Sequence, residues 1–190
     1  MSSSLYLAVV HYPVYNKHKE IVTTAFTNLD IHDFARLART YNIPKVFFIS
    51  PLEIQKKLGI RLVDYWTKGK GGERNPDRKE ALSVISFKNT LEEAQEAICG
   101  LNHQDLLIVT TTAREQNKAI NPDELKNLIY KHGKSILLVF GTGFGLTEEF
   151  MAQTDYVLSP IKGACNYNHL SVRSAASIIV DRIYSYRQGS

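Results

Sequence analysis

The segment Asp30-Ile-His-Asp-Phe-Ala-Arg-Leu-Ala-Arg-Thr-Tyr-Asn-Ile-Pro-Lys-Val-Phe-Phe48 passes from a helical pattern to a strand pattern. Its apolar side chains recur every three or four residues as far as Tyr41, which predicts an amphipathic helix with Asp30 as a plausible N-cap. Residues 45–50 then form an apolar run that Pro51 closes, and this pattern predicts a buried strand. A helix that leads directly into a buried strand is typical of α/β proteins.

The rest of the chain repeats this alternation. Further strands are expected at 5–10, 81–87, 106–109, 136–140 and 156–158. Helices are expected at 52–58, 62–66, 91–99, 122–131 and 170–187. Because apolar strands that alternate with helices are buried on both faces, we predict an α/β fold with a mostly parallel sheet and helices on both sides.

Length and composition limit the class of protein further. The chain has 190 residues, 44% of them hydrophobic, and a formal net charge of +4, which suits one globular domain over 1–190. Cys99 and Cys165 are too few for a disulfide framework or a metal cluster, and two isolated thiols fit a reducing, cytoplasmic location. No apolar run approaches the ~20 residues of a membrane span, and the first strand lacks the basic residues that precede a signal sequence.

A glycine-rich turn follows the strand expected at 136–140. Its glycines stand at 141, 143 and 145, but a dinucleotide-binding fingerprint requires glycine at Leu146, and no Gly-Lys-Ser/Thr follows as in a Walker A loop. The turn is therefore either a tight strand-to-helix connection with positive φ or a place where backbone approaches a ligand closely.

A basic segment occupies residues 68–79. It holds three glycines and five basic residues, which predicts a mobile basic loop. It is either a solvated surface loop or a segment that contacts RNA or gates a site. The net positive charge permits an anionic partner such as RNA without requiring one.

Three segments together resemble the SPOUT class of RNA methyltransferases, in its SpoU-like branch. Residues 30–48 are similar to the first motif of the class, and 139–146 resemble the second, a strand that feeds a glycine loop. Residues 155–163 followed by 169–176 resemble the third. The stretches 27–33 and 167–175 are similar to a small bacterial SPOUT family, whose domain occurs alone or fused to tRNA guanine methyltransferases.

The resemblance implies a C-terminal deep trefoil knot, a homodimer and S-adenosylmethionine held in the loops of the knot. Loops at the carboxyl ends of strands supply the backbone groups that such a cofactor needs. The residues expected to bind it are Thr110, Thr111, Thr112, Phe140, Gly141, Thr142, Gly143, Gly145, Leu158, Ser159, Ile161, Gly163, Leu170 and Ser171. No metal ion is implied.

The SpoU-like branch uses an arginine of the first motif to activate the methyl acceptor, and the resemblance assigns that role to Arg36. Arg36 shares a polar helix stripe with His32 and Arg39. The alternative is that this stripe is only the solvent-exposed face of an amphipathic helix. On that face Asp33 could form an ion pair with Arg36 at i,i+3.

Asn168 and His169 are the other catalytic candidates. They either orient the acceptor or cap the last helix, and the cap is the better-supported role for Asn168. His11 follows the first strand and is expected at the same mouth. The chain departs from the branch because Thr142 leaves no place for an acidic residue in the glycine loop, so a ribose hydroxyl and a base nitrogen both stay open as acceptor.

The predicted function is an S-adenosylmethionine-dependent methyltransferase that acts on RNA, tRNA or rRNA, as a homodimer. Residues expected to face RNA are Arg36, Arg39, Lys68, Lys70, Arg74 and Arg78. One alternative is a non-enzymatic module that binds RNA or cofactor, since the domain also occurs fused to another methyltransferase. A weaker alternative is a nucleotide-binding protein whose glycine loop holds phosphates.

Overall fold

The computed structural model of the protein describes residues 4–102, 106–165 and 167–184. Its centre is a seven-stranded sheet in which every pair of neighbouring strands is parallel. The strand order is β5 (Ile85–Lys88), β4 (Val46–Ile49), β1 (Leu5–Val10), β8 (Ser135–Gly141), β6 (Leu106–Thr111), β9 (Tyr156–Leu158) and β7 (Ala119–Ile120). The predicted α/β class with a parallel sheet is confirmed.

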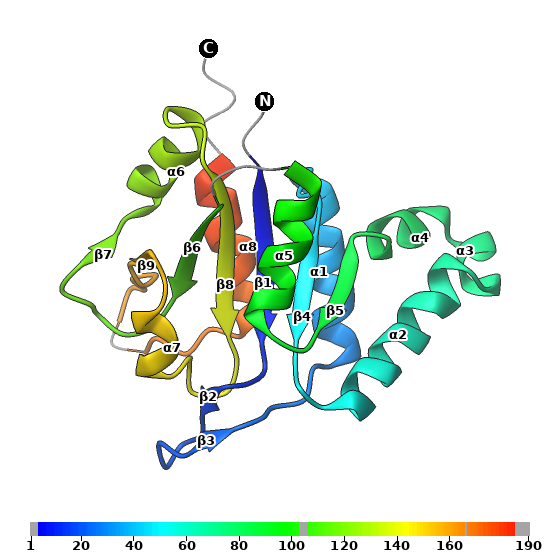
Figure 1. Cartoon of the computed structure of the whole chain (residues 1–190), viewed down its shortest axis with the longest axis horizontal. Helices are drawn as coiled ribbons and strands as arrows, with labels where there is room; N and C mark the ends of the chain where they lie inside the picture. Colours follow the sequence, from blue (N-terminus) through cyan, green and yellow to red (C-terminus); the bar gives the residue numbers. More distant parts are fainter. Residues whose placement is uncertain (1–3, 103–105, 166, 185–190) are drawn as a thin grey trace.

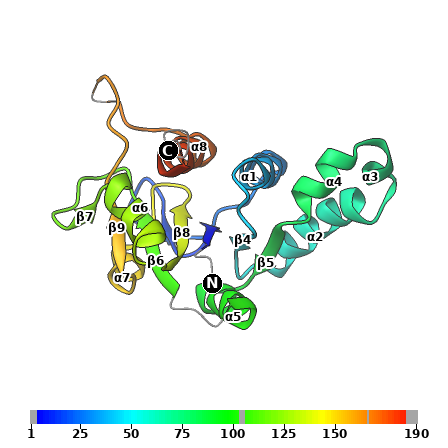
Figure 2. The same ribbon diagram turned by 90° about the horizontal axis from the view of Figure 1, so that it is seen from above.

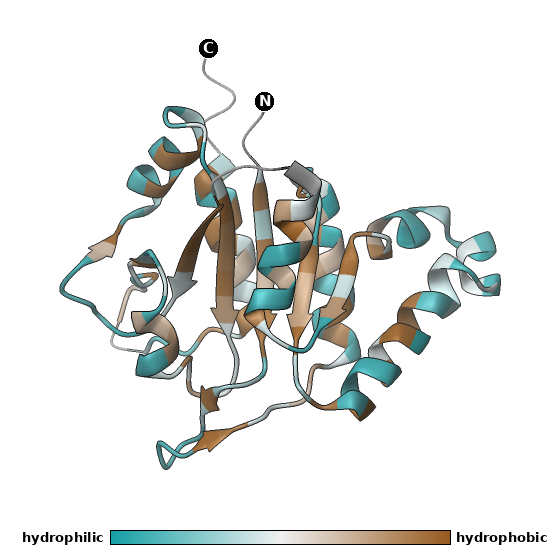
Figure 3. Ribbon diagram, in the orientation of Figure 1, coloured by the Kyte–Doolittle hydropathy of each residue, from teal (hydrophilic) through white to brown (hydrophobic). Residues whose placement is uncertain are grey.

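Helices cover both faces of the sheet (Figure 2). On one face lie α1 (Asn28–Thr40), α6 (Pro122–Tyr130) and α8 (Val172–Tyr184). On the other lie α5 (Leu91–Asn102) and α7 (Glu148–Ala152). The strands are apolar, whereas the helices turn polar residues outward, as Figure 3 shows by colour.

The central strand β1 feeds both halves of the core. Leu7 and Val9 pack with the cluster that contains α1 and α8, and Ala8 and Val10 pack with the cluster on the opposite face. Successive side chains of a strand point to opposite faces, so a strand covered on both sides must be apolar throughout. All six residues of β1 are buried, which is why its run in the sequence is continuous.

Three helices form an arm beyond the β5 edge of the sheet (Figure 1): α2 (Glu53–Thr67), α3 (Lys70–Arg74) and α4 (Pro76–Leu82). The prediction of a mobile loop over 68–79 is therefore wrong. The side chain of Asn75 accepts a hydrogen bond from the Arg78 amide at 3.0 Å, and Pro76 occupies the first turn, so α4 has a regular start. Gly71 and Gly72 are buried against Trp66. A Cβ at these positions would lie 2.8 and 2.2 Å from atoms of Trp66, so only glycine allows this packing.

Several element boundaries also differ from the predictions. The two short helices expected at 52–58 and 62–66 are one continuous helix, α2. Gly59 does not interrupt this helix, because it is buried where α2 packs closely on Phe87. Residues 81 and 82 belong to α4, so the strand expected from 81 begins at 85. The last helix begins at 172 and is described to 184; residues 185–187 lie outside the described part.

A two-stranded antiparallel hairpin, β2 (Val14–Tyr15) and β3 (Ile21–Val22), leaves the carboxyl end of β1 before α1 begins. It lies at the lower edge of the sheet in Figure 1, where the arrowheads of β1 and β8 also end. No helix in the described part is long and apolar enough to cross a membrane. The trefoil knot stays a prediction.

Candidate functional site

A cavity of about 650 Å³ lies at the carboxyl edge of the sheet, where β1, β6 and β8 end. Its size falls within the range of small-molecule sites, roughly 300–1,000 Å³. Its walls come from the residue after β1, the segment before α1, the ends of β6 and β8, and the segment that leads into α8. This is the edge at which open α/β sheets bind ligands.

Ten residues that the resemblance assigns to the cofactor line this cavity. They are Thr111, Thr112, Phe140, Gly141, Thr142, Gly143, Gly145, Ile161, Leu170 and Ser171. Asn168 and His169, expected near the acceptor, line it as well. The structure thus brings together segments of the chain that lie far apart in the sequence.

Four expected cofactor residues lie outside the lining of the cavity. Thr110 is buried inside β6 and its hydroxyl donates to the Tyr156 carbonyl at 3.3 Å, so it faces the opposite side of the strand from Thr111. Leu158 is buried in β9, and the Ser159 amide bonds to the Ile120 carbonyl at 2.8 Å. Gly163 is exposed. The first three contribute to the sheet edge that carries the lining residues.

The glycine loop is held by the β2–β3 hairpin. The Phe144 amide donates to the Tyr15 carbonyl at 2.8 Å, and the Tyr15 amide donates to the Gly145 carbonyl at 2.9 Å. Gly143 has a φ of +60°, and a Cβ added to it would lie 2.9 Å from the Tyr15 carbonyl oxygen. Both the backbone conformation and the close approach therefore require glycine at 143.

A chain of hydroxyl groups connects the loop to His11. The Thr142 hydroxyl donates to the Val10 carbonyl at 3.0 Å and also contacts the Thr24 hydroxyl, whose oxygen lies 3.0 Å from Nδ1 of His11. His11 is buried, and burial lowers its pKa to about 4, with the Asp30 carboxylate partly opposing this effect. The imidazole is therefore neutral near pH 7.

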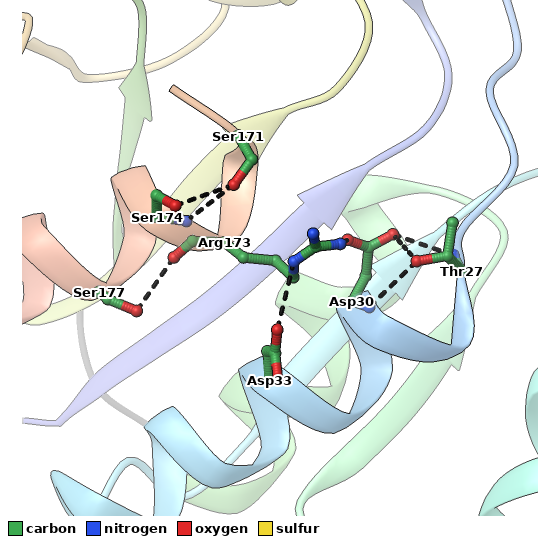
Figure 4. A network of polar contacts seen from close by, with 7 residues as sticks. All are labelled: Thr27, Asp30, Asp33, Ser171, Arg173, Ser174 and Ser177. Carbon is green, nitrogen blue, oxygen red and sulfur yellow. Dashed lines mark hydrogen bonds and ion pairs between the residues drawn. The ribbon is translucent and has the colours of Figure 1, made fainter. Parts of the chain in front are cut away.

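A partly buried group of ion pairs joins the first turns of α1 and α8 (Figure 4). Arg173 contacts Asp30 through Nη1 at 2.9 Å and Asp33 through Nε at 3.2 Å. Asp30 is not the N-cap that the sequence suggested: Thr27 caps α1, and Asp30 closes a capping box by accepting from the Thr27 amide at 2.9 Å. The ion-pair partner of Asp33 is Arg173, whereas the sequence suggested Arg36. Asp30 also contributes to the cavity wall.

Asn168 and His169 occupy the segment that enters α8. The Asn168 side chain donates to the Ala113 carbonyl at 2.9 Å and so joins this segment to the loop after β6. The prediction that Asn168 caps the last helix is wrong, since the Ser171 hydroxyl accepts from the Ser174 amide at 3.2 Å. The His169 ring packs edge-on against Tyr167, with centroids 5.2 Å apart.

Arg36 lies in a second, more open groove between α1 and α8. The groove has a volume of about 540 Å³ and is lined by Asp33, Arg36, Leu37, Thr40, Ser171, Arg173, Ser174 and Ser177. Arg36 does not line the cavity, but Ser171 lines both spaces. The start of α8 therefore separates the expected activating arginine from the expected cofactor site.

The other basic residues expected to face RNA lie away from the cavity. Arg39 forms an ion pair with Glu80 of the arm, and Lys68 pairs with Asp64 at 2.8 Å. The Arg78 guanidinium lies over the Trp66 ring, 4.6 Å from its centroid. The remaining two, Lys70 and Arg74, are exposed on α3.

The geometry suits a small organic ligand held mainly by backbone. Among the described residues no group of three or more His, Cys, Asp or Glu is placed to hold a metal ion. Sequence reasoning missed Thr24 and Arg173 as parts of the site. Nothing in the sequence around Thr24 indicates its contact with Thr142, which is 118 residues away. Arg173 could have been proposed as a partner for Asp30 and Asp33, because it is a basic residue in the third motif.

Comparison with known proteins agrees with this geometry. Residues 4–185 match a family model described as SAM-dependent RNA methyltransferase. An uncharacterised protein from Aquifex aeolicus is 38% identical over 185 residues, which is 97% of this chain and 90% of that protein. A tRNA (guanine-N(1)-)-methyltransferase from Nitratidesulfovibrio vulgaris is 41% identical over 180 residues, or 95% of this chain and 42% of that protein. The chain thus spans less than half of the latter relative.

The fold also occurs in solved methyltransferase structures. The SpoU methyltransferase AviRb from Streptomyces viridochromogenes, in complex with the cofactor AdoMet, has a TM-score of 0.58 to this chain at 13% sequence identity. The likeness covers 96% of this chain and 57% of AviRb. At this identity the comparison shows a shared fold.

We predict that Gly143→Val weakens binding of S-adenosylhomocysteine about tenfold or more. A β-branched residue at positive φ costs about 1–3 kcal/mol of backbone strain, and its Cβ would displace the loop from Tyr15. Isothermal titration calorimetry measures the dissociation constant. Gly100→Val is the matched control, because a Cβ at 100 meets nothing within 4 Å. An unchanged constant for Gly143→Val would move the ligand site away from this loop.

We also predict that Arg173→Ala lowers the free energy of unfolding by about 2 kcal/mol, because it leaves the Asp30 carboxylate buried without its cation. Urea unfolding followed by circular dichroism measures the change. Arg182→Ala removes an exposed guanidinium from the same helix and is expected to change the free energy by less than about 0.5 kcal/mol. Equal effects of the two substitutions would show that the pair does not stabilise the fold.

Proposed function

This chain belongs to the family of SAM-dependent RNA methyltransferases, and from that membership we propose that it transfers a methyl group to a nucleotide of RNA. The observation that carries the proposal is the cavity at the carboxyl edge of the sheet, which unites residues from all three motif segments. We propose tRNA as the RNA, since the chain is 41% identical to part of a tRNA (guanine-N(1)-)-methyltransferase.

The residues of the cavity fit S-adenosylmethionine. A Cβ at Gly141 would lie 2.8 Å from the Leu146 amide nitrogen, and Gly143 and Gly145 have positive φ, so the loop exposes backbone at a place where side chains cannot intrude. Backbone of 141–145 and 111–113 would hold the polar groups of the cofactor, and Leu170 with Ile161 would pack against its apolar surface. When bound, S-adenosylmethionine supplies an electrophilic methyl group.

We propose that RNA lies across the start of α8, because Ser171 borders both the cavity and the groove that holds Arg36. Arg36 then reaches the acceptor from the groove side and favours its reactive form. Lys70 and Arg74, exposed on the arm, supply phosphate contacts that weaken with salt. Arg78 contributes instead to the arm, through its position over Trp66.

We propose a homodimer with a net charge of about +8, twice the +4 of one chain. Three exposed apolar side chains support it: Phe144 and Leu170, which line the cavity, and Leu29 in the first turn of α1, which are 56, 48 and 60% exposed. Val172 and Ala175 of α8 line the cavity, so these apolar side chains do not need a second chain to cover them. Sedimentation equilibrium is expected to give twice the mass of one chain; the mass of a single chain would contradict the dimer.

A second candidate function is a non-enzymatic module that binds cofactor or RNA. It is favoured by one observation, that the chain spans 42% of a relative whose named activity need not reside in the shared part. Binding of S-adenosylhomocysteine without methyl incorporation into any RNA would support the module and contradict the enzyme.

The test of the proposed function combines methyl transfer with one substitution. Incubation of the protein with methyl-tritiated S-adenosylmethionine and unmodified bacterial tRNA transcripts is expected to label the RNA. Arg36→Ala is expected to lower that rate at least about 100-fold, as for loss of a group that activates the acceptor, while affinity for S-adenosylhomocysteine stays within about threefold.

Arg182→Ala, which removes an exposed arginine far along α8, is the control and is expected to retain the rate. Full activity of Arg36→Ala would show that another residue activates the acceptor. Absence of labelling by the wild-type protein would contradict the proposed function itself.

A further inference from the structure

His11 is a buried titratable group in the cavity wall for which the proposed function gives no role. It follows β1 directly, is 1% exposed, and packs against Phe26 and Phe48 with ring centroids 5.4 and 6.2 Å away. His11 also belongs to the lining of the cavity, together with Thr24 and Asp30. A histidine that only filled the core would be costlier than a Phe or Leu, because its two nitrogens require partners.

The hydrogen bonds around His11 fix which ring nitrogen carries the proton. A carbonyl oxygen only accepts hydrogen bonds, so the Thr142 hydroxyl donates its one hydrogen to the Val10 carbonyl. The contact between the two threonine hydroxyls then requires Thr24 to donate to Thr142. The weaker 3.5 Å contact of the Thr24 hydroxyl with the His11 carbonyl draws on the same proton.

With its proton committed, the Thr24 oxygen accepts from His11, and Nδ1 of His11 is therefore the N–H donor at 3.0 Å. A neutral imidazole has one N–H, so Nε2 holds a bare lone pair. Nε2 is buried and has no hydrogen-bond partner among the described residues. The lowered pKa of His11, caused mainly by burial, keeps the ring neutral and the lone pair available near pH 7.

The position of His11 indicates which ligand meets it. The segments 111–113, 140–145 and 170–171 make one part of the cavity wall and are the ones proposed to hold the cofactor. His11, Thr24, Ala25 and Asp30 belong to none of these segments and form a separate part of the lining, which we name the acceptor wall. A molecule that enters a cavity already occupied by cofactor meets the acceptor wall.

We propose that His11 is the general base of the methyl transfer, accepting at Nε2 the proton of a ring N–H of the nucleobase that is methylated. The inference rests on the proposed function. The acceptor nitrogen forms a bond to the methyl carbon as the carbon–sulfur bond breaks with its electron pair left on sulfur. The N–H proton passes to Nε2, and the products are the methylated base, S-adenosylhomocysteine and an imidazolium.

The surroundings of His11 suit this transfer. Asp30 is the charged group that acts on the ring, and its carboxylate favours the imidazolium that forms. Arg173 holds that carboxylate at 2.9 Å, and Thr24 fixes the ring through Nδ1. The orienting contact on one nitrogen and the free lone pair on the other match the arrangement of histidine bases in general.

A nucleobase nitrogen is favoured over a ribose hydroxyl as the proton donor. Burial makes Nε2 a weak base, and a weak base removes a proton from a ring N–H more readily than from an alcohol. The glycine loop, residues 141–145, has no acidic side chain that could serve as a base in place of His11. Methyl groups mapped to ribose oxygen would overturn this assignment.

Two substitutions of His11 separate the base from a structural role. In His11→Asn the amide nitrogen lies where Nδ1 was and still donates to Thr24, but the second ring nitrogen is lost. We expect methyl transfer to tRNA transcripts to fall about 10²–10⁴-fold, the usual contribution of a general base, with S-adenosylhomocysteine affinity within about threefold. His11→Gln, which keeps an acceptor near the Nε2 position without its basicity, is expected to lose activity equally.

Each variant has a defined contrary result. If His11→Asn retains wild-type transfer, the role of His11 is confined to its bond with Thr24 and the inference is wrong. If His11→Gln alone retains transfer, Nε2 only accepts a hydrogen bond and is not the base. Thr24→Val is the matched control for the orienting contact: a loss of activity much smaller than that of His11→Asn is expected, since the base itself remains.

A measurement on the wild-type protein tests the inference without activity. Nitrogen-15 NMR of histidine-labelled protein is expected to report the Nδ1–H tautomer for His11 and a ring that stays neutral between pH 8 and 6. The Nε2–H tautomer would overturn the inference. Wild-type protein that methylates no RNA would overturn the proposed function and the base role together, whereas labelling by the wild type and by His11→Asn alike would overturn only the base role.

Discussion

The carboxylate of the buried Asp30, in the first turn of α1, and the guanidinium of the half-buried Arg173, in the first turn of α8, lie 2.9 Å apart. Asp30 requires this partner, because an ionised carboxylate taken out of water without a cation is strongly unfavourable. The pair fixes the distance between the two helix starts, and both starts carry walls of the cavity. The segment that enters α8 contributes Leu170 and Ser171, and the start of α1 contributes Asp30 itself. This contact therefore helps to set the shape of the site.

The cavity divides into parts with different chemistry. The glycine loop is held to the β2–β3 hairpin by backbone hydrogen bonds. It presents backbone groups to the cavity at positions that do not accommodate side chains. The acceptor wall instead offers a neutral imidazole whose orientation is set by Thr24 and Thr142. Because Thr142 belongs to the glycine loop and Thr24 to the acceptor wall, their contact couples the two parts. A ligand that shifts the loop would therefore also shift the ring of His11.

Much of the fold was predictable from the sequence, because strands buried on both faces must be continuously apolar and helices show their own period. The arm was not: the glycines of 68–79 indicated mobility, whereas Gly71 and Gly72 allow close packing on Trp66. The resemblance placed ten of its fourteen expected cofactor residues in the lining of the cavity, and seven of the ten lie at or just after the carboxyl ends of β6 and β8. The contact of Thr24 with Thr142 could not be predicted, because it joins residues 118 apart and depends on the path of the hairpin.

We propose that the cavity at the carboxyl edge of the sheet binds the methyl donor. Amide hydrogen exchange, measured by mass spectrometry with and without saturating S-adenosylhomocysteine, tests it most directly. Binding is expected to slow exchange in residues 140–145 and 168–172 and to leave the arm helices α2, α3 and α4 unchanged. Protection confined to the arm, or none at 140–145 under saturating ligand, would contradict the claim.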